Sequence, residues 1–293
     1  MRRTTQFVLT MLFTLLFGGC VWEDMTNCDV YLHIKYDYNK DGINQILEEV
    51  DQLDLFIFLE DGRLYKRLSL QPKTDGTSVK LPLEGGTYHL MAWGNLPPPT
   101  HQEVSYHYDA HLGKLVYQSE DLVFQDSIAG LFWGETKSFT IDGDNRNSVE
   151  LSLIKNTKHI DVVIIGGAFT NTHCELFAEN RNHDNENTPF DLLNSQPKIE
   201  TESGNLIYRF NTHRLLASDA AKSGLRFYGK KSHRSDIESI VNTSLIDLLL
   251  ANPNIDDLDR FDHYTIKLEF TDGFLSPRIY VNDWLVIDMP EDL

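Results

Sequence analysis

Much of the chain after residue 28 consists of short runs in which apolar and polar positions alternate, separated by glycine, proline, asparagine or aspartate. A period of two, with many β-branched and aromatic residues, is typical of strands that bury one face. In the first half this pattern predicts strands at 30–36, 53–60, 63–70, 77–83, 87–93, 131–134, 137–141 and 148–154. Residues 100–127 are polar, and we expect an irregular segment there.

Turn signals join some of these runs. Asp61-Gly62 separates 53–60 from 63–70, and Asp-Gly between two strand-like runs is a strong hairpin signal. The Glu-Gly-Gly turn at 84–86 predicts a second hairpin between its two flanking runs. Three prolines at 97–99 then end this hairpin, because proline cannot donate a hydrogen bond to a sheet.

The second half continues the β pattern and adds one helical segment. Strands are predicted at 159–167, 173–180, 205–211 and 225–229, with a polar loop at 181–189. Residues 235–251 place apolar side chains at a helical spacing, with Ser235 or Asp236 as the cap and Asn252-Pro253 as the end. A closing hairpin is predicted from 263–270 and 277–289, around Asp272-Gly273.

Short strands with frequent turns favour β-sandwiches over a doubly wound α/β fold. The length of 293 residues favours two domains. We therefore predict a mainly all-β chain with two tandem β-sandwich domains, at 20–154 and 155–293, and one short helix in the second.

The first twenty residues, MRRTTQFVLTMLFTLLFGGC, have the layout of a secretory signal peptide. Arg2 and Arg3 supply the positive charge, and the apolar run ends in Gly-Gly-Cys. The small residues before Cys20 are similar to a bacterial lipobox, which predicts a signal at 1–19, cleavage between Gly19 and Cys20, and diacylation of Cys20. Two or three acyl chains would hold a soluble domain on a bilayer. The alternative is an ordinary signal peptide with an incidental cysteine.

Charge excludes one class of partner. The chain carries 44 acidic and 26 basic residues, and its net charge of −18 becomes two units more negative when Arg2 and Arg3 leave with the signal. Such a chain repels phosphate backbones, so we expect no nucleic-acid partner. The apolar run of the signal is too short for a spanning helix, and no second apolar stretch is long enough to span a membrane.

Candidate chemistry is sparse. We find no G-x-S-x-G, S-x-x-K or H-E-x-x-H motif and no C-x-x-C pair, so we expect neither an enzyme nor a cofactor. The remaining cysteines, Cys28 and Cys174, are expected as buried free thiols, although a disulfide is possible outside the cytoplasm. The acceptor-like sequence Asp126-Ser127-Ile128 marks Ser127 as a possible O-glycosylation site.

Two polar clusters could be mistaken for metal sites. The spacing of the first matches no zinc pattern, so a solvated loop is favoured for His101, His107, Asp109 and His111. The second, with Asp37, Asn39 and Asp41, resembles the start of a calcium loop but lacks the bidentate glutamate. We therefore expect no metal.

Several stretches in this order resemble the FimB/Mfa-type fimbrial anchor subunits of Gram-negative gut and oral anaerobes. They are Glu23-Asp24, Cys28, IKYDYN (34–39), VDQLDLFIFLEDGRL (50–64), GGTYHLMAWGNL (85–96), AGLFWGE (129–135), LIDLLL (245–250), DRFDHYTIKLEF (259–270) and RIYVNDW (278–284). The resemblance implies transthyretin-like sandwiches and an outer-membrane lipoprotein at the base of a pilus, facing the cell exterior. It also implies a pilin partner and assembly by strand exchange, and Glu23-Asp24 resemble an acidic tag for surface export.

Three functions remain open: a lipid-anchored fimbrial subunit, a surface lipoprotein that binds glycans, and a hydrolase, for which no motif is present. An anchor should bury Trp93, Trp133 and Trp284, whereas a glycan binder should expose aromatic rings on one face. We expect Trp284 to pack inward. A last strand at 278–289, or the sheet edge it covers, is hypothesised to contact the pilin, and the alternative is that it only closes the second domain. The sequence does not identify the pilin, nor does it distinguish an anchor from an accessory or tip subunit.

Overall fold

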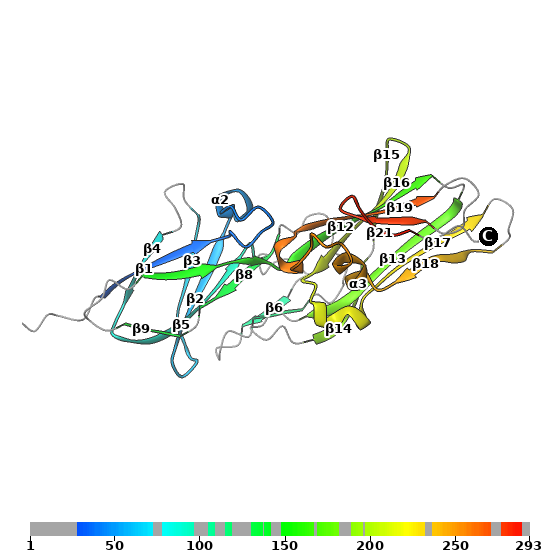
Figure 1. Cartoon of the computed structure of the whole chain (residues 1–293). Helices are drawn as coiled ribbons and strands as arrows, with labels where there is room; N and C mark the ends of the chain where they lie inside the picture. Colours follow the sequence, from blue (N-terminus) through cyan, green and yellow to red (C-terminus); the bar gives the residue numbers. More distant parts are fainter. Residues whose placement is uncertain are drawn as a thin grey trace, which may run out of the picture.

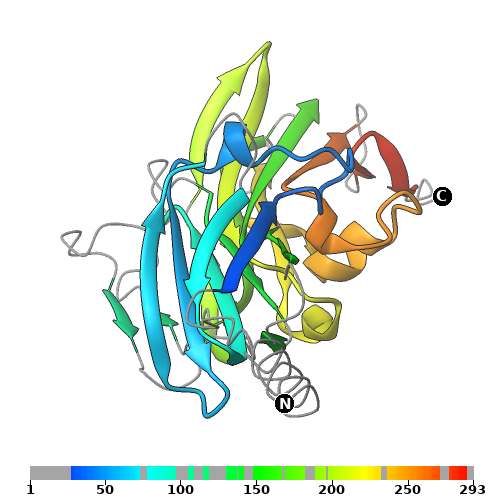
Figure 2. The same cartoon turned by 90° about the vertical axis from the view of Figure 1, so that its left-hand side faces the viewer.

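The computed structural model describes residues 28–72, 78–96, 105–108, 115–118, 130–136, 138–141, 148–166, 169–181, 189–195, 197–231, 236–270 and 277–288. Two pairs of packed sheets lie end to end, and we call them the first and the second sandwich (Figure 1). Viewed along the long axis, one lies behind the other (Figure 2). The predicted fold class, mainly β with tandem sandwiches and a short helix in the second, is confirmed.

The first sandwich packs a three-stranded sheet against a larger one. The smaller sheet has the order β10 (Ser148–Ser152), β1 (Cys28–Lys35) and β4 (Ser78–Leu83). The larger sheet has the order β11 (Ile154–Lys155), β8 (Phe132–Glu135), β5 (Gly86–Gly94), β2 (Leu53–Leu59) and β3 (Leu64–Leu70), and β9 (Phe139–Ile141) also pairs with β5. Alternate apolar residues such as Leu32, Leu55 and Leu90 fill the space between the sheets. The continuous apolar run of β2 is buried on both faces, because Phe56 and Phe58 pack with Trp93 on the outer side.

The hairpin predicted around Asp61-Gly62 is confirmed, since β2 and β3 pair antiparallel and Gly62 has φ of 79°. The hairpin predicted around residues 84–86 is wrong. β4 pairs with β1, whereas β5 pairs with β2, β8 and β9, so the turn crosses from one sheet to the other. A strand shows the same alternation whichever sheet it joins, because both sheets face one core.

The segment at 100–127, predicted to be irregular, contains a paired β6 (Ser105–Tyr108) and β7 (Leu115–Gln118).

The second sandwich packs a six-stranded sheet against a four-stranded sheet. The six strands have the order β15 (Lys198–Glu202), β16 (Asn205–His213), β12 (Thr157–Gly166), β19 (His263–Phe270), β20 (Arg278–Val281) and β21 (Trp284–Ile287). The four strands have the order β14 (Pro189–Ser195), β13 (Phe169–Arg181), β17 (Gly224–Lys231) and β18 (Glu238–Thr243). The core includes Ile160, Tyr208, Phe227 and Ile266. β11 ends at Lys155 and β12 begins at Thr157, and the boundary predicted between residues 154 and 155 stays a prediction.

The helix predicted over 235–251 is wrong in its first half. Residues 238–243 form β18, paired with β17, and only α3 (Leu245–Leu250) is helical. The Ser244 side chain caps α3 by accepting a hydrogen bond from the Asp247 N–H at 3.2 Å. Ile240 and Val241 are β-branched and pack on the core from a strand, so pairing with β17 overrides the helical spacing. The first sandwich also has a short helix that was not predicted, α2 (Ile46–Glu49), and the second has two 3₁₀ turns, η2 (Ala217–Lys222) and η3 (Leu258–Arg260).

The last strand predicted at 278–289 is in fact a hairpin of β20 and β21. Asn282 and Asp283 have φ of 46° and 67°, as a tight two-residue hairpin turn requires, and both residue types tolerate that conformation. Asn282 is also tied to β19, because its N–H donates to the Thr265 carbonyl at 2.8 Å and its Oδ1 accepts from the Thr265 N–H at 2.9 Å.

The reversal at Asn282 changes the position of Trp284. Trp93 is fully buried and Trp133 is half-buried, but Trp284 is 47% exposed, so the prediction that Trp284 packs inward is wrong. It lies on an edge strand directly after the turn rather than inside a long strand.

Cys174 is a buried free thiol, as predicted, and burial raises its pKa. Cys28 lies in β1, but its side chain is outside the described part.

We predict that Trp93→Ala lowers the free energy of unfolding by about 3 to 5 kcal/mol, because it leaves a large cavity in the first sandwich. Trp284→Ala should cost about 1 kcal/mol or less, since much of that ring is already in water. Urea unfolding of both variants, followed by circular dichroism, measures the two losses. Equal losses would contradict the exposed position of Trp284.

Candidate functional site

The best-defined polar site lies at the joint, the contact between the end of the first sandwich and the start of the second (Figure 1). Tyr36 and Tyr38 follow β1, and both reach across to the second sandwich. The Tyr36 hydroxyl donates to Asp262 Oδ2 at 2.5 Å, and the Tyr38 hydroxyl donates to Asp257. Asp257 caps η3, and Asp262 directly precedes β19. The strand that begins the described chain is therefore linked to the start of β19.

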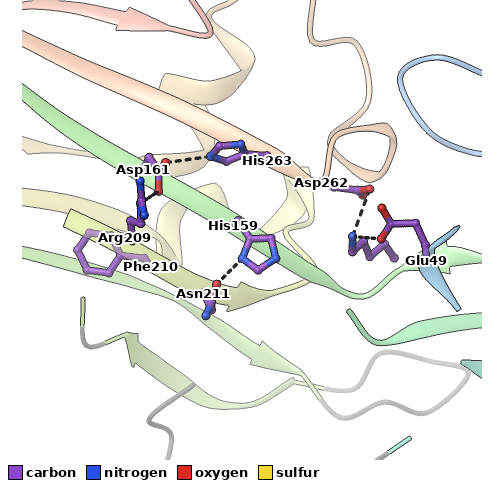
Figure 3. A pocket seen from close by; sticks show the side chains of 9 residues that line it. Glu49, His159, Asp161, Arg209, Phe210, Asn211, Asp262 and His263 are labelled. Atoms are coloured by element: carbon purple, nitrogen blue, oxygen red, sulfur yellow. Dashed lines mark hydrogen bonds and ion pairs between the residues drawn. The ribbon is translucent and has the colours of Figure 1, made fainter. Parts of the chain in front are cut away.

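Two lysines converge on the same carboxylate. Lys155 Nζ lies 3.6 Å from Asp262 Oδ2 and 2.9 Å from Glu49 Oε2 (Figure 3). Lys158 Nζ lies 3.8 Å from Asp262 Oδ1 and donates to the Asp259 carbonyl at 3.2 Å. The Lys158 side chain is completely buried and that of Lys155 nearly so. Buried ammonium groups need such partners, because an unpaired buried charge is very costly.

Burial changes the proton affinities at the joint. It lowers the pKa of Lys158 to about 8, although Asp262 and Asp259 favour the charged form. Burial also raises the pKa of the Tyr36 hydroxyl, and the Asp262 carboxylate raises it further. Tyr36 therefore stays a neutral donor at physiological pH.

The second-sandwich side of the joint is held by further pairs. Arg214 donates to both Asp259 oxygens, Nε to Oδ1 at 2.7 Å and Nη2 to Oδ2 at 2.5 Å. The Asp257 side chain accepts from the Asp259 N–H at 2.9 Å. These bonds fix η3. They therefore hold in place the Asp259 carbonyl, which meets Lys158, and the Asp257 carboxylate, which meets Tyr38.

Asn95 organises the first-sandwich side. It has φ of 58°, and its Nδ2 donates to the Glu49 carbonyl at 2.9 Å and to the Gly130 carbonyl at 3.0 Å. Its Oδ1 accepts from the Asp51 N–H at 2.8 Å. A Cβ on Gly130 would lie 2.5 Å from Lys155 Cε, so a glycine at this position leaves room for the lysine stem. The motifs around 50–64, 85–96 and 129–135 thus meet beside Lys155.

A cleft of about 530 Å³ opens beside the joint, lined by Glu49, Lys155, His159, Asp161, Arg209, Phe210, Asn211, Asp262 and His263. Its polar side chains pair across the strands (Figure 3). Asp161 contacts Arg209 at 3.6 Å and His263 at 3.3 Å, and His159 hydrogen bonds to Asn211. Among the described residues, no group of three metal-ligating side chains converges. Most of the polar side chains that line the cleft are thus paired with one another by hydrogen bonds or ion pairs.

The other candidate surface is the C-terminal edge of the six-stranded sheet. β21 ends that sheet, and Trp284 and Leu285 on it are both large, apolar and exposed. In the described part of the chain, no helix is both apolar and long enough to cross a bilayer.

The structure does not describe most of the sites predicted from sequence. Gly19, Cys20 and Ser127 are outside the described residues, as are His101, Asp109 and His111. His107 lies in β6, but its side chain is not described. In the calcium-like segment, Asn39 bonds inward to the Tyr36 and Ile43 carbonyls and closes a turn.

Sequence reasoning missed the joint residues themselves. The signal was present, because Tyr36 lies in IKYDYN and Asp262 in DRFDHYTIKLEF, two of the motifs that carry the family resemblance. Nothing in either motif, however, indicates that they meet.

Comparison with known proteins places these motifs in a family. Residues 25–289 match the profile of the fimbrillin-A associated anchor proteins Mfa1 and Mfa2. The chain belongs to this family. The family consists of fimbrial anchor proteins and is not a class of enzymes. No curated protein matches the chain significantly.

Solved structures share the fold. A candidate polysaccharide-binding protein of Bacteroides thetaiotaomicron has a TM-score of 0.74 and 22% identity, over 90% of this chain and 99% of that one. The fimbrial anchor protein Mfa2 of Porphyromonas gingivalis has a TM-score of 0.69 and 16% identity, over 88% and 98%. A candidate adhesin of Bacteroides ovatus has a TM-score of 0.67 and 19% identity, over 91% and 98%. The family model thus identifies the chain as a protein of the fimbrial anchor family, and the solved structures show that it shares their fold.

We predict that the joint stabilises the chain through coupled contacts. Asp262→Asn should lower the free energy of unfolding by about 3 kcal/mol, because it leaves Lys158 buried without its countercharge. Tyr36→Phe removes one hydrogen bond and should cost about 1 kcal/mol. A double-mutant cycle by urea unfolding should give a coupling of at least about 0.5 kcal/mol. Purely additive losses would mean that the two side chains do not interact in solution.

A second prediction concerns pH and His213, at the end of β16. Burial lowers its pKa from the ordinary 6.5 to about 4. The unfolded chain therefore binds a proton that the folded chain does not, and stability falls as the pH drops from 6.5 to 4. The contribution is about 3 kcal/mol.

The measurement compares the native chain with His213→Gln by urea unfolding at several pH values. The advantage of the native chain should shrink below pH 6.5, while carboxylates common to both proteins cancel. A constant difference from pH 7 to pH 4 would contradict the buried, neutral His213.

Proposed function

We propose that this protein is the lipid-anchored subunit at the base of a fimbrium. Cys20 would carry the acyl chains in the outer membrane, the folded part would face the cell exterior, and the second sandwich would bind a fimbrial stalk subunit by strand exchange. Membership of the fimbrial anchor family is the observation that carries the proposal. The lipobox-like residues before Cys20 support attachment to the membrane through that cysteine.

The arrangement of the described chain supports this orientation. β1 begins at the outer end of the first sandwich and runs toward the joint (Figure 1). The described part of the chain therefore begins at the end opposite the second sandwich. A lipid at Cys20 would place the first sandwich next to the membrane and the second farther out. Strand exchange supplies affinity through main-chain hydrogen bonds and specificity through alternate side chains.

The test of attachment is Cys20→Ala, with Cys28→Ala as the matched control. We expect Cys20→Ala to leave the outer-membrane fraction, because the acyl chains are its hydrophobic anchor, while Cys28→Ala stays. Fractionation of cells and the mass of the N-terminal peptide provide the readouts. Membrane retention of the Cys20 variant, with an unmodified peptide in the native protein, would refute lipid anchoring.

Glycan binding is the second candidate, because Trp284 is exposed and one structural neighbour is a candidate polysaccharide-binding protein. Burial of Trp93 weighs against the aromatic platform that this function needs. Titration with cell-surface oligosaccharides, followed by tryptophan fluorescence, tests it. Saturable binding that Trp284→Ala abolishes would favour a glycan-binding role.

A further inference from the structure

The edge strands of the four large sheets differ in how they are protected. Natural sheets guard their edges with charges, prolines or very short strands, since an exposed edge can pair with another chain. β4, β10, β3, β11, β15, β14 and β18 all contain at least one charged residue, and β4 and β14 also contain proline. β9, which lies beside β5, has only three residues. β21 has the sequence Trp-Leu-Val-Ile, without a charge or a proline.

The two edges of the six-stranded sheet show the contrast most clearly. β15 carries Lys198, Glu200 and Glu202, and Glu200 pairs with Arg209 of the neighbouring strand at 2.5 Å. At the opposite edge, Trp284 and Leu285 are adjacent and exposed by 47% and 41%. Charge therefore guards one edge of this sheet and not the other.

The β21 edge is held in place rather than frayed. Asn252 Nδ2 donates to the Val281 carbonyl at 2.8 Å, and the Asn282 turn is bound to Thr265 of β19. Arg278 pairs with Asp288 at 3.0 Å across the open end of the hairpin. A rigid edge loses little conformational entropy when a strand is added.

The hairpin geometry directs specific groups outward. In a two-residue hairpin the pair next to the turn, here Val281 and Trp284, is hydrogen-bonded, so the N–H and C=O of Leu285 point away from β20. Asp283 and Asp288 lie at the two ends of β21, where Asp283 pairs with Lys267 and Asp288 pairs with Arg278. The edge therefore offers main-chain bonds at its centre, apolar side chains beside them and an ion pair at each end.

We propose that the edge of β21 accepts an extended strand of the fimbrial stalk subunit. The inference rests on the proposed function and specifies its contact. The incoming strand pairs with Trp284–Ile287 and carries apolar side chains on both faces, because Trp284 and Leu285 are adjacent and point to opposite faces of the sheet. A strand is the occupant that fits, because only an extended backbone can hydrogen bond to the outward-pointing N–H and C=O groups of an edge strand.

The test places on β21 the kind of charge that guards the other edges. Leu285→Lys is compared with Ile199→Lys, which adds the same charge to the exposed Ile199 of β15 at the opposite edge of the same sheet. Each full-length protein is made in cells that assemble fimbriae and is purified from outer membranes, and the stalk subunit that copurifies is quantified. We expect at least about a tenfold loss for Leu285→Lys and no change for Ile199→Lys, with melting temperatures near that of the native protein.

A photo-crosslinking residue at position 285, with position 199 as the control, shows what touches the edge and remains informative if Leu285→Lys does not fold. Crosslinks from position 285 should map to one extended segment of the stalk subunit. Crosslinks to a second copy, to this chain's own last residues, or to no stalk segment would overturn the assignment.

The result separates this inference from the proposed function. If the native protein copurifies with the stalk subunit and folded Leu285→Lys does so equally, the contact lies elsewhere and the anchor function stands. If the native protein copurifies with no stalk subunit, the proposed function fails, and with it the assignment of β21.

Discussion

The Asp262 carboxylate is the contact on which the arrangement of the two sandwiches depends. It accepts a hydrogen bond from Tyr36 of the first sandwich and faces the buried ammonium groups of Lys155 and Lys158. Buried ion pairs add little net stability, because desolvation offsets the attraction, but one unpaired charge is strongly unfavourable. Any other orientation of the sandwiches would separate Asp262 from Tyr36 and Lys155 of the first sandwich. The joint therefore specifies geometry more than it adds stability.

Local patterns could predict the strands because burial of one face imposes a period of two wherever a strand lies. The β2–β3 hairpin was predictable too, since Asp61-Gly62 encodes its own turn. Pairing was not predictable where it depends on the other sheet, as for β4 and β5. At 235–251 and 278–289 the sequence suits two structures, and the choice depends on pairing of β18 with β17 and on a turn of two non-glycine residues, Asn282 and Asp283.

The site was less predictable than the fold. The motifs marked the family because several of them build the joint, yet Tyr36 and Asp262 are 226 positions apart. Among 44 acidic residues, no sequence feature singles out Asp262 as the partner of two buried lysines. The burial of Lys158 was equally hidden, since a lysine side chain is normally solvated.

The joint also determines how a pull on this molecule would be transmitted, if it anchors a fimbrium as proposed. β1 enters from the membrane end, and Tyr36 and Tyr38 connect its far end to Asp262 and Asp257. Asp262 directly precedes β19, which pairs with β20 and so supports the β21 edge. β1 itself is paired along its length with β4 and β10, so tension along β1 loads many main-chain hydrogen bonds at once. The few side chains of the joint then connect this strand to the sheet that carries β21. Short charged bonds suit that task, because they constrain direction as well as distance.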